Sequence, residues 1–311
     1  MQHLNSLENI SIDHAWVTIG SFDGVHLGHK SILKDLQAQA HLAHHPAVVI
    51  TFYPHPAIVL NKNKTPYYYL SAPEERARLL EEIGVDYTFT LHFDQQFAAQ
   101  SADVFFEKIL QHINIAELWV GYDFALGHDR SGDISSIKAI ALKNNFKVKT
   151  ISPLLLENGK PISSSQIREL IVEGKVDEAA KLLGRYYEIP GIVVSGDRRG
   201  GRLGFPTANI NYWPEKVLPA LGVYATWTWV DQIKYASVTN VGIRPTFEHT
   251  QVPPRIETHL LDYHGDVYEK KLQVDFVSHI RDEKKFDGVN GLINQIENDK
   301  KVAREVLRNE T

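Results

Sequence analysis

Residues 20–29 read Gly-Ser-Phe-Asp-Gly-Val-His-Leu-Gly-His, and they stand between a short β-rich run and a helical pattern. The glycines in this stretch permit tight turns and a close approach of the backbone to a ligand. The free N–H groups at the start of a helix, with their partial positive charge, favour phosphate. We therefore expect a phosphate- or nucleotide-binding turn whose candidate residues are Gly20, Phe22, Asp23 and Gly24.

Two histidines follow at helical spacing. His26 and His29 are three residues apart, so both imidazoles share one face of the expected helix. Such a pair can hydrogen-bond phosphate oxygens and stabilise the charge that develops during attack on an α-phosphorus. Two alternatives stay open: the pair can be ordinary surface residues, or it can bind a metal ion, although no cysteine and no obvious third ligand is near.

Outward from this turn, the first half of the chain alternates apolar runs with helical patterns, which predicts βαβ units and a parallel sheet. The near-continuous apolar run at 47–52 suits a sheet that is covered on both faces. The expected strands are 16–19, 47–52, 87–91, 118–122 and 147–151, and the expected helices are 26–44, 73–83, 105–112, 135–144 and 164–183.

From about residue 187 the sequence pattern changes to short β-rich runs separated by Gly, Pro, Asn and Asp. This pattern predicts a small antiparallel barrel or sandwich. One or two helices are expected over 288–307, and a domain boundary is expected near residue 185. The expected strands are 191–195, 222–230, 235–241, 256–261 and 272–276.

Composition limits the class of protein. The 311 residues carry a formal net charge of -5, which argues against a nucleic-acid binder with a broad basic surface. With no cysteine, disulfides and thiolate catalysis are impossible. Residues 1–13 do not have the pattern of a signal peptide, and no stretch approaches the length of a membrane span. We therefore expect a cytoplasmic protein.

Two later segments also favour phosphate. Ser163, Ser164 and Ser165 lie at an expected helix start and are followed by Arg168, so they can clamp phosphates. The alternative is a plain serine N-cap with an arginine that faces solvent. The stretch 196–209 holds three arginines and four glycines and ends in Gly-Phe-Pro-Thr-Ala-Asn; it can wrap phosphates or be an ordinary surface loop.

The first half resembles a known superfamily. The His-x-Gly-His element and the Ser-Ser-x-x-Ile-Arg element are similar to the segments that close over ATP in nucleotidyltransferases. The stretches 51–56 (Thr-Phe-Tyr-Pro-His-Pro) and 121–132 resemble flavin and adenine contacts of the FMN adenylyltransferase domain of bacterial bifunctional FAD synthetases. This resemblance implies that Asp123 contacts the nucleotide, that Arg168 and the histidines are catalytic, and that the flavin contacts Phe52, Pro54 and Pro56.

The second half resembles riboflavin kinase. The resemblance rests on Gly-Phe-Pro-Thr-Ala-Asn at 204–209, on 239–247, and on Ile-Glu-Thr-His-Leu-Leu-Asp at 256–262. It implies that Glu257 is the general base on the riboflavin 5′-hydroxyl. The further implied contacts are Mg²⁺ with Thr207 and Asn209, flavin with Arg244, and nucleotide with Arg199, Gly200 and Gly204.

Taken together, the resemblance implies a bifunctional enzyme of flavin cofactor biosynthesis. A Rossmann-like nucleotidyltransferase domain over 1–185 would convert FMN and ATP to FAD and pyrophosphate. A six-stranded riboflavin kinase barrel with a terminal helix over 186–311 would convert riboflavin and ATP to FMN and ADP. Two rival functions stay open: another adenylyl- or cytidylyltransferase, and a flavin- or nucleotide-binding regulator without catalysis.

Overall fold

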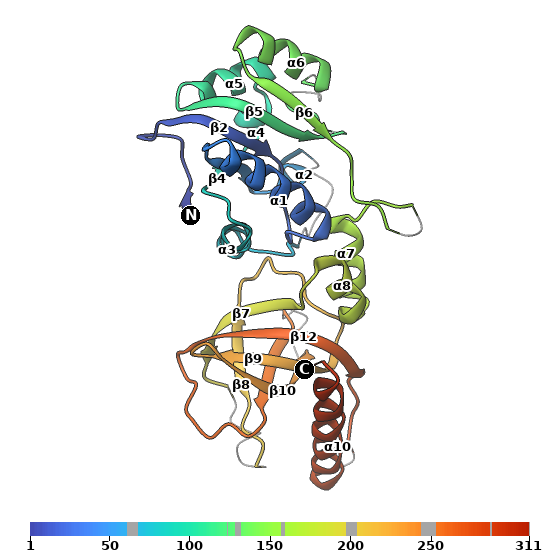
Figure 1. Cartoon of the computed structure of the whole chain (residues 1–311). Helices are drawn as coiled ribbons and strands as arrows, with labels where there is room; N and C mark the ends of the chain where they lie inside the picture. The colour runs from blue at the N-terminus through green and yellow to red at the C-terminus, as the bar shows by residue number, and fades with distance from the viewer. Residues whose placement is uncertain are drawn as a thin grey trace. The chain divides into compact units, whose positions relative to one another are not determined.

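The computed structural model describes residues 1–60, 68–122, 124–127, 132–156, 159–196, 204–243, 253–286 and 288–310. The chain divides into two compact units, Met1–Ser164 and Ser165–Thr311 (Figure 1). The boundary expected near residue 185 stays a prediction; the two helices before it have their contacts mainly in the second unit.

The first unit is built on a parallel sheet, as the alternation of strands and helices predicts. Within the described residues its strand order is β1-β4-β3-β2-β5-β6, and every neighbouring pair is parallel. Parallel strands require crossover connections, which the intervening helices supply. The strands are β1 (Gln2–Leu4), β2 (Ile12–Ile19), β3 (Ala47–Tyr53), β4 (Tyr87–His92), β5 (Ile113–Gly121) and β6 (Lys147–Ile151).

Helices cover both faces of this sheet. In β3, Val48 and Ile50 pack into the core beneath α5 and α6, whereas Val49 packs with Leu33 of α1 and Leu79 of α3. Alternation of side chains along the strand explains why this run is apolar at every position. The helices are α1 (Leu27–Leu42), α2 (Pro56–Leu60), α3 (Pro73–Ile83), α4 (Gln95–Ala98), α5 (Ala102–Leu110) and α6 (Ile134–Lys143).

The second unit contains a closed antiparallel barrel, of strand order β10-β11-β8-β7-β12-β9 among the described residues. This confirms the expected barrel and excludes the sandwich. Closure removes exposed sheet edges, so a small unit can be stable with short strands. The strands are β7 (Tyr187–Val194), β8 (Ala208–Tyr212), β9 (Gly222–Val230), β10 (Ile233–Gly242), β11 (Arg255–Leu260) and β12 (Lys271–Arg281).

Part of the barrel interior is polar. Thr226, Ser237, Thr239 and Thr258 are fully buried, and their hydroxyls form a chain of hydrogen bonds of 2.7–2.9 Å between β9, β10 and β11. Each hydroxyl can donate once and accept twice, so the chain satisfies buried groups that would otherwise be costly. Because Thr258 points inward, its neighbours on β11 point to the other face.

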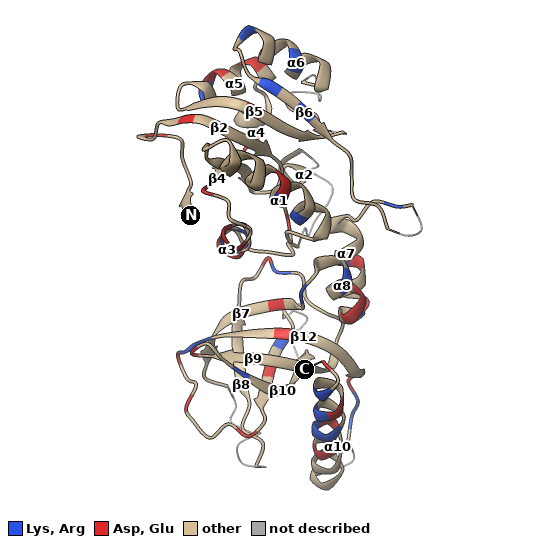
Figure 2. Cartoon of the chain, viewed as in Figure 1, with Lys and Arg blue, Asp and Glu red and all other residues tan. Residues whose placement is uncertain are grey.

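Within its described residues, three helices complete the second unit: α7 (Ser164–Val172), α8 (Val176–Leu183) and α10 (Val289–Arg308). The helical pattern over 164–183 is interrupted at Gly174, and the last pattern forms a single helix. In Figure 2, α10 carries charges of both signs. The sequence of β3, in contrast, contains no charged residue. Of the helices in the described ranges, none combines the length and apolar character needed to cross a membrane.

Candidate active sites

The turn after β2 has a strained, left-handed backbone, and at Gly24 it leaves no room for a side chain. Phe22, Gly24 and Val25 have φ angles of 46°, 78° and 40°, in the left-handed region. A Cβ atom on Gly24 would lie 2.7 Å from Cδ1 of Leu70, and one on Gly20 would lie 3.0 Å from the ring of Phe22. The backbone therefore folds closely on itself immediately before α1 begins, which places this turn at the N-terminus of that helix, where the partial positive charge favours anions.

Asp23 holds this turn in place. Its buried carboxylate accepts hydrogen bonds from the backbone N–H of Leu70 and of Ser71, each at 3.1 Å. The backbone N–H of Gly24 donates to Oγ of Ser71 at 3.0 Å. The hydroxyl of Ser164 donates to the carbonyl oxygen of Asp23 at 2.8 Å. The late serine segment and the early turn, 141 residues apart, therefore meet, and the Asp23 carboxylate anchors the loop before α3.

The two histidines are stacked at the N-terminus of α1. His26 is the N-cap, and its Nδ1 accepts a hydrogen bond from the backbone N–H of His29 at 3.4 Å. Their ring centroids lie 3.7 Å apart, and the ring of Phe22 meets His29 edge-on at 5.2 Å. Burial, followed by the neighbouring His26 and Arg76, lowers the pKa of His29 well below its usual range. His29 is therefore a neutral imidazole, and its buried Nδ1 has no hydrogen-bond partner in the structure.

Arg76 is a residue of this region that the sequence analysis missed. It is 1% exposed, and its NH1 donates to Oγ1 of Thr51 and to the carbonyl oxygen of Ser21, both at 2.8 Å. It thereby links the turn after β2 to β3 and places a positive charge beside that turn. Its helical spacing could have revealed that it is buried, because Arg76 lies three and four residues before Leu79 and Leu80 and so shares the buried face of α3 with them.

The other expected residues of this half differ in their surroundings. The ring of Phe52 is 4% exposed and packs against Phe93, Phe97 and Phe105, so it belongs to the core of the first unit. Pro54 follows β3, and Pro56 begins α2. Ser163 precedes α7. Ser165 and Arg168 belong to the second unit, where NH1 of Arg168 donates to Oγ of Ser165 at 3.4 Å. Asp123 lies outside the described residues.

The metal alternative for the histidines receives no support from the structure. Across the described ranges there is no group of three His, Cys, Asp or Glu side chains arranged to hold a metal ion. The stacked pair with an unpaired ring nitrogen instead has the character of a polar site that can hydrogen-bond a ligand.

A cavity of about 370 Å³ opens against the barrel of the second unit. One wall comes from the barrel and the segment before β8, and the other comes from the segment after β12 and from α10. The lining residues are Phe205, Thr207, Val223, Val238, Asn240, Glu257 and His259 on the first wall, and Arg281, Glu283, Lys284, Phe286, Leu292, Ile296 and Asp299 on the second. Apolar walls with a few convergent polar groups are typical of a small-molecule site.

Glu257 is the carboxylate of the barrel wall of this cavity. It lies on β11 directly opposite Asn209 of β8, and Thr258 is directly opposite Ala208. Thr207 immediately precedes β8 and also lines the cavity. The side chain of Asn209 packs on Gly196, where a Cβ atom would lie 2.2 Å from its Nδ2. The structure thus brings three of the expected residues to neighbouring strand positions.

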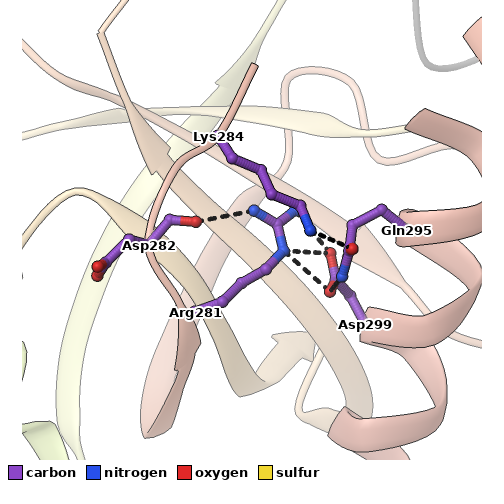
Figure 3. A network of polar contacts seen from close by, with 5 residues as sticks. All are labelled: Arg281, Asp282, Lys284, Gln295 and Asp299. Carbon is purple, nitrogen blue, oxygen red and sulfur yellow. Dashed lines mark hydrogen bonds and ion pairs between the residues drawn. The ribbon is translucent and has the colours of Figure 1, made fainter. Parts of the chain in front are cut away.

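The second wall is fixed by a network around Arg281 (Figure 3). Nε and NH2 of Arg281 donate to the carboxylate of Asp299 on α10 at 2.8–3.1 Å, and Asp299 is 2% exposed. Gln295 donates to the same carboxylate at 2.7 Å and accepts from Lys284. This bidentate pair connects α10 to the end of β12.

Of the remaining expected residues of this half, the structure describes Gly204, which has a φ of 86° in the left-handed region. Arg199, Gly200 and Arg244 lie outside the described residues.

Comparison with known proteins agrees with an organisation into two different units. The family model described as FAD synthetase matches residues 9–166, and the one described as riboflavin kinase matches residues 183–307. Proteins named bifunctional riboflavin kinase/FMN adenylyltransferase are similar along most of their length. The one from Listeria monocytogenes is 34% identical over 93% of this chain and 91% of its own, and the one from Escherichia coli K12 is 36% identical over 93% and 91%.

A solved structure shares the fold across the whole chain. A crystal structure described as a macrolide-efflux protein from Streptococcus pneumoniae is 33% identical, with a TM-score of 0.83, and covers 97% of this chain and 98% of its own. Because both family models match in order and curated relatives cover nearly the entire chain, this protein belongs to the family of bifunctional riboflavin kinases/FMN adenylyltransferases.

Proposed function

We propose that the cavity of the second unit phosphorylates riboflavin to FMN and that the turn of the first unit adenylates FMN to FAD. Membership of the family gives both activities and their substrates, riboflavin, FMN, FAD and ATP. Our proposal assigns each activity to particular side chains. The observation that carries it is Glu257, a carboxylate opposite Asn209 in the wall of a cavity of about 370 Å³.

In the kinase reaction, Glu257 accepts the proton of the riboflavin 5′-hydroxyl while that oxygen bonds to the γ-phosphorus of ATP and ADP leaves. The hydroxyl of Thr207 and the amide oxygen of Asn209 are hard oxygen donors of the kind that Mg²⁺ prefers, so they fit such an ion. Bound there, Mg²⁺ supplies charge neutralisation for the phosphoryl group. Arg244, Arg199, Gly200 and Gly204 remain proposed ligands of flavin and nucleotide.

In the adenylyl transfer, an FMN phosphate oxygen bonds to the α-phosphorus of ATP and pyrophosphate leaves. The N–H groups at the start of α1 and the imidazoles of His26 and His29 stabilise the charge on the phosphorus oxygens. Burial favours a neutral His29, which donates a hydrogen bond without releasing a proton. Asp123, the serines at 163–165, Arg168, Phe52, Pro54 and Pro56 remain proposed contacts of nucleotide, phosphate and flavin.

The decisive experiment is a time course with riboflavin, ATP and Mg²⁺ in which the flavins are separated by chromatography. FMN that appears first and FAD that appears later supports both assignments. A parallel reaction with FMN and ATP isolates the second step. Binding of flavin without turnover of ATP would contradict the proposal and favour a regulator.

A further inference from the structure

The position of Thr207 is not set by the strand pairing that fixes Glu257. The register between β8 and β11 ends at the pair Ala208–Thr258, and Thr207 lies one residue beyond it. A proposed metal ligand therefore stands at the end of the ladder, where the two strands separate. A side-chain contact between β11 and the segment before β8 would determine how far Thr207 lies from the carboxylate of Glu257.

His259 makes such a contact. Its Nδ1 lies 2.8 Å from the carbonyl oxygen of Pro206, the residue before Thr207. A carbonyl oxygen only accepts, so Nδ1 carries the proton and donates. Burial is the largest influence on the pKa of His259 and lowers it; the hydrogen bond to the Pro206 carbonyl opposes this shift, and the net pKa stays below its usual value. A neutral ring of this tautomer leaves Nε2 as an acceptor.

Two further contacts hold the ring in this orientation. Phe205 is 7% exposed, and its ring meets the imidazole edge-on at 6.0 Å and 81°. The Nζ of Lys300, on α10, lies 5.0 Å from the centroid of the Phe205 ring. His259 also lines the cavity together with Glu257, two residues away on the same face of β11.

We propose that His259 is a positioning residue of the kinase site: its hydrogen bond to the Pro206 carbonyl sets the place of the Thr207 hydroxyl relative to Glu257. This inference rests on the proposed function, which makes Glu257 the base and Thr207 a metal ligand. His259 acts through the backbone of residues 206–207, in the way that groups behind a metal ligand orient the ligand itself.

The test compares three substitutions that differ in the place of one N–H group. The amide of His259→Asn can present an N–H at the position of Nδ1, that of His259→Gln presents it farther out, and His259→Ala has none. For Gln and Ala we expect the Mg²⁺ concentration that gives half-maximal riboflavin phosphorylation to rise by roughly 10-fold or more, as is usual when a ligand loses its support. His259→Asn should recover most of this loss.

Metal binding is also measured without turnover. Mn²⁺ is titrated into the full chain in the presence of ADP, and the free ion is followed by electron paramagnetic resonance. The Gln and Ala variants should bind Mn²⁺ more weakly, whereas the Asn variant should stay near the parent. The adenylyl-transfer site contributes equally in all samples. The exposed His264→Gln serves as the matched control.

Several results would overturn the inference. Asn, Gln and Ala variants that are equally impaired would show that the ring matters for packing alone, and variants with unchanged metal requirement would show that it does not position Thr207. FMN adenylylation in the same samples reports whether the first unit is intact, and thermal unfolding reports whether the second unit is folded. A Glu257→Gln variant tests the proposed function separately: if it retains full kinase activity, the site assignment fails, whereas loss of activity there with a normal His259→Ala contradicts only this inference.

Discussion

Glu257 and Asn209 face each other as paired residues of the antiparallel strands β11 and β8. A carboxylate and an amide that are held at one register position can act together on one phosphoryl transfer, the carboxylate as the base and the amide as a metal ligand. We expect Glu257→Gln to lower riboflavin phosphorylation by roughly 10²–10⁴-fold, since general base catalysis contributes about that much. Initial rates of FMN formation from riboflavin and ATP measure the effect.

The same variant should convert FMN to FAD at nearly the parental rate, because that step is assigned to the other unit. Glu305→Gln, an exposed glutamate on α10, is the matched control and should leave both activities unchanged. Loss of FAD formation in Glu257→Gln with the fold preserved would contradict the division of labour.

The buried cation Arg76 leads to a prediction for the first unit. Arg76→Met removes the donor that joins Ser21 to Thr51 and the positive charge beside the turn at 20–25, the proposed phosphate site. A displacement of about 1 Å at a reacting centre costs roughly 10²-fold in rate, so we expect FMN adenylylation to fall by that order. Arg78→Met on the same helix, where the side chain is 42% exposed and pairs with Glu82, should have little effect. A parental rate in Arg76→Met would show that this arginine serves stability alone, which thermal unfolding reports independently.

The ion pair between Arg281 and Asp299 predicts a large effect on stability. Asp299 is 2% exposed, so Asp299→Asn leaves a guanidinium without its carboxylate and should cost about 3–5 kcal/mol. Replacing both partners by apolar residues should recover much of this cost. Glu297→Gln breaks an exposed pair with Lys300 on the same helix and should cost less than about 1 kcal/mol. Denaturant unfolding measures all three, and equal costs would contradict the argument.

Asp275 makes the second unit sensitive to pH. Burial raises its pKa to about 6; hydrogen bonds from Gln273 and Trp229 oppose this shift, and the charge of Glu188 adds to it. The folded carboxyl thus holds its proton more tightly than the unfolded one, whose pKa is 3.8. The stability due to this group is fully present below about pH 4 and is lost as the pH rises through about 6. The full change is roughly 3 kcal/mol.

Thermal unfolding between about pH 4 and pH 7 measures this dependence. Asp275→Asn should flatten the difference across the window, because it removes the titrating group. Glu188→Gln should move the window to lower pH, since it removes a charge that raises the pKa of Asp275. A parental pH dependence in Asp275→Asn would assign the effect to other carboxylates.

The sequence predicts most elements because their patterns are strong and local. β3 and α3 were both expected from the sequence. A strand that is buried on two faces is apolar at every position, whereas a helix that is buried on one face has apolar residues three and four positions apart. β8 was not predicted, because Asn209 and Asn211 interrupt its apolar residues and asparagine is uncommon in strands. This strand carries Asn209, the proposed metal ligand, and departures from the usual composition are expected at functional sites.

The sequence by itself determined the fold class, the order of the two units and the motifs at 20–29 and 204–209, since these depend on residue type and spacing along the chain. Only the tertiary structure decided the partners of the individual side chains. Asp23 meets Ser71, Arg76 meets Thr51, and Arg281 meets Asp299, each across many residues. Such contacts depend on how strands and helices pack in space, which spacing along the chain does not encode.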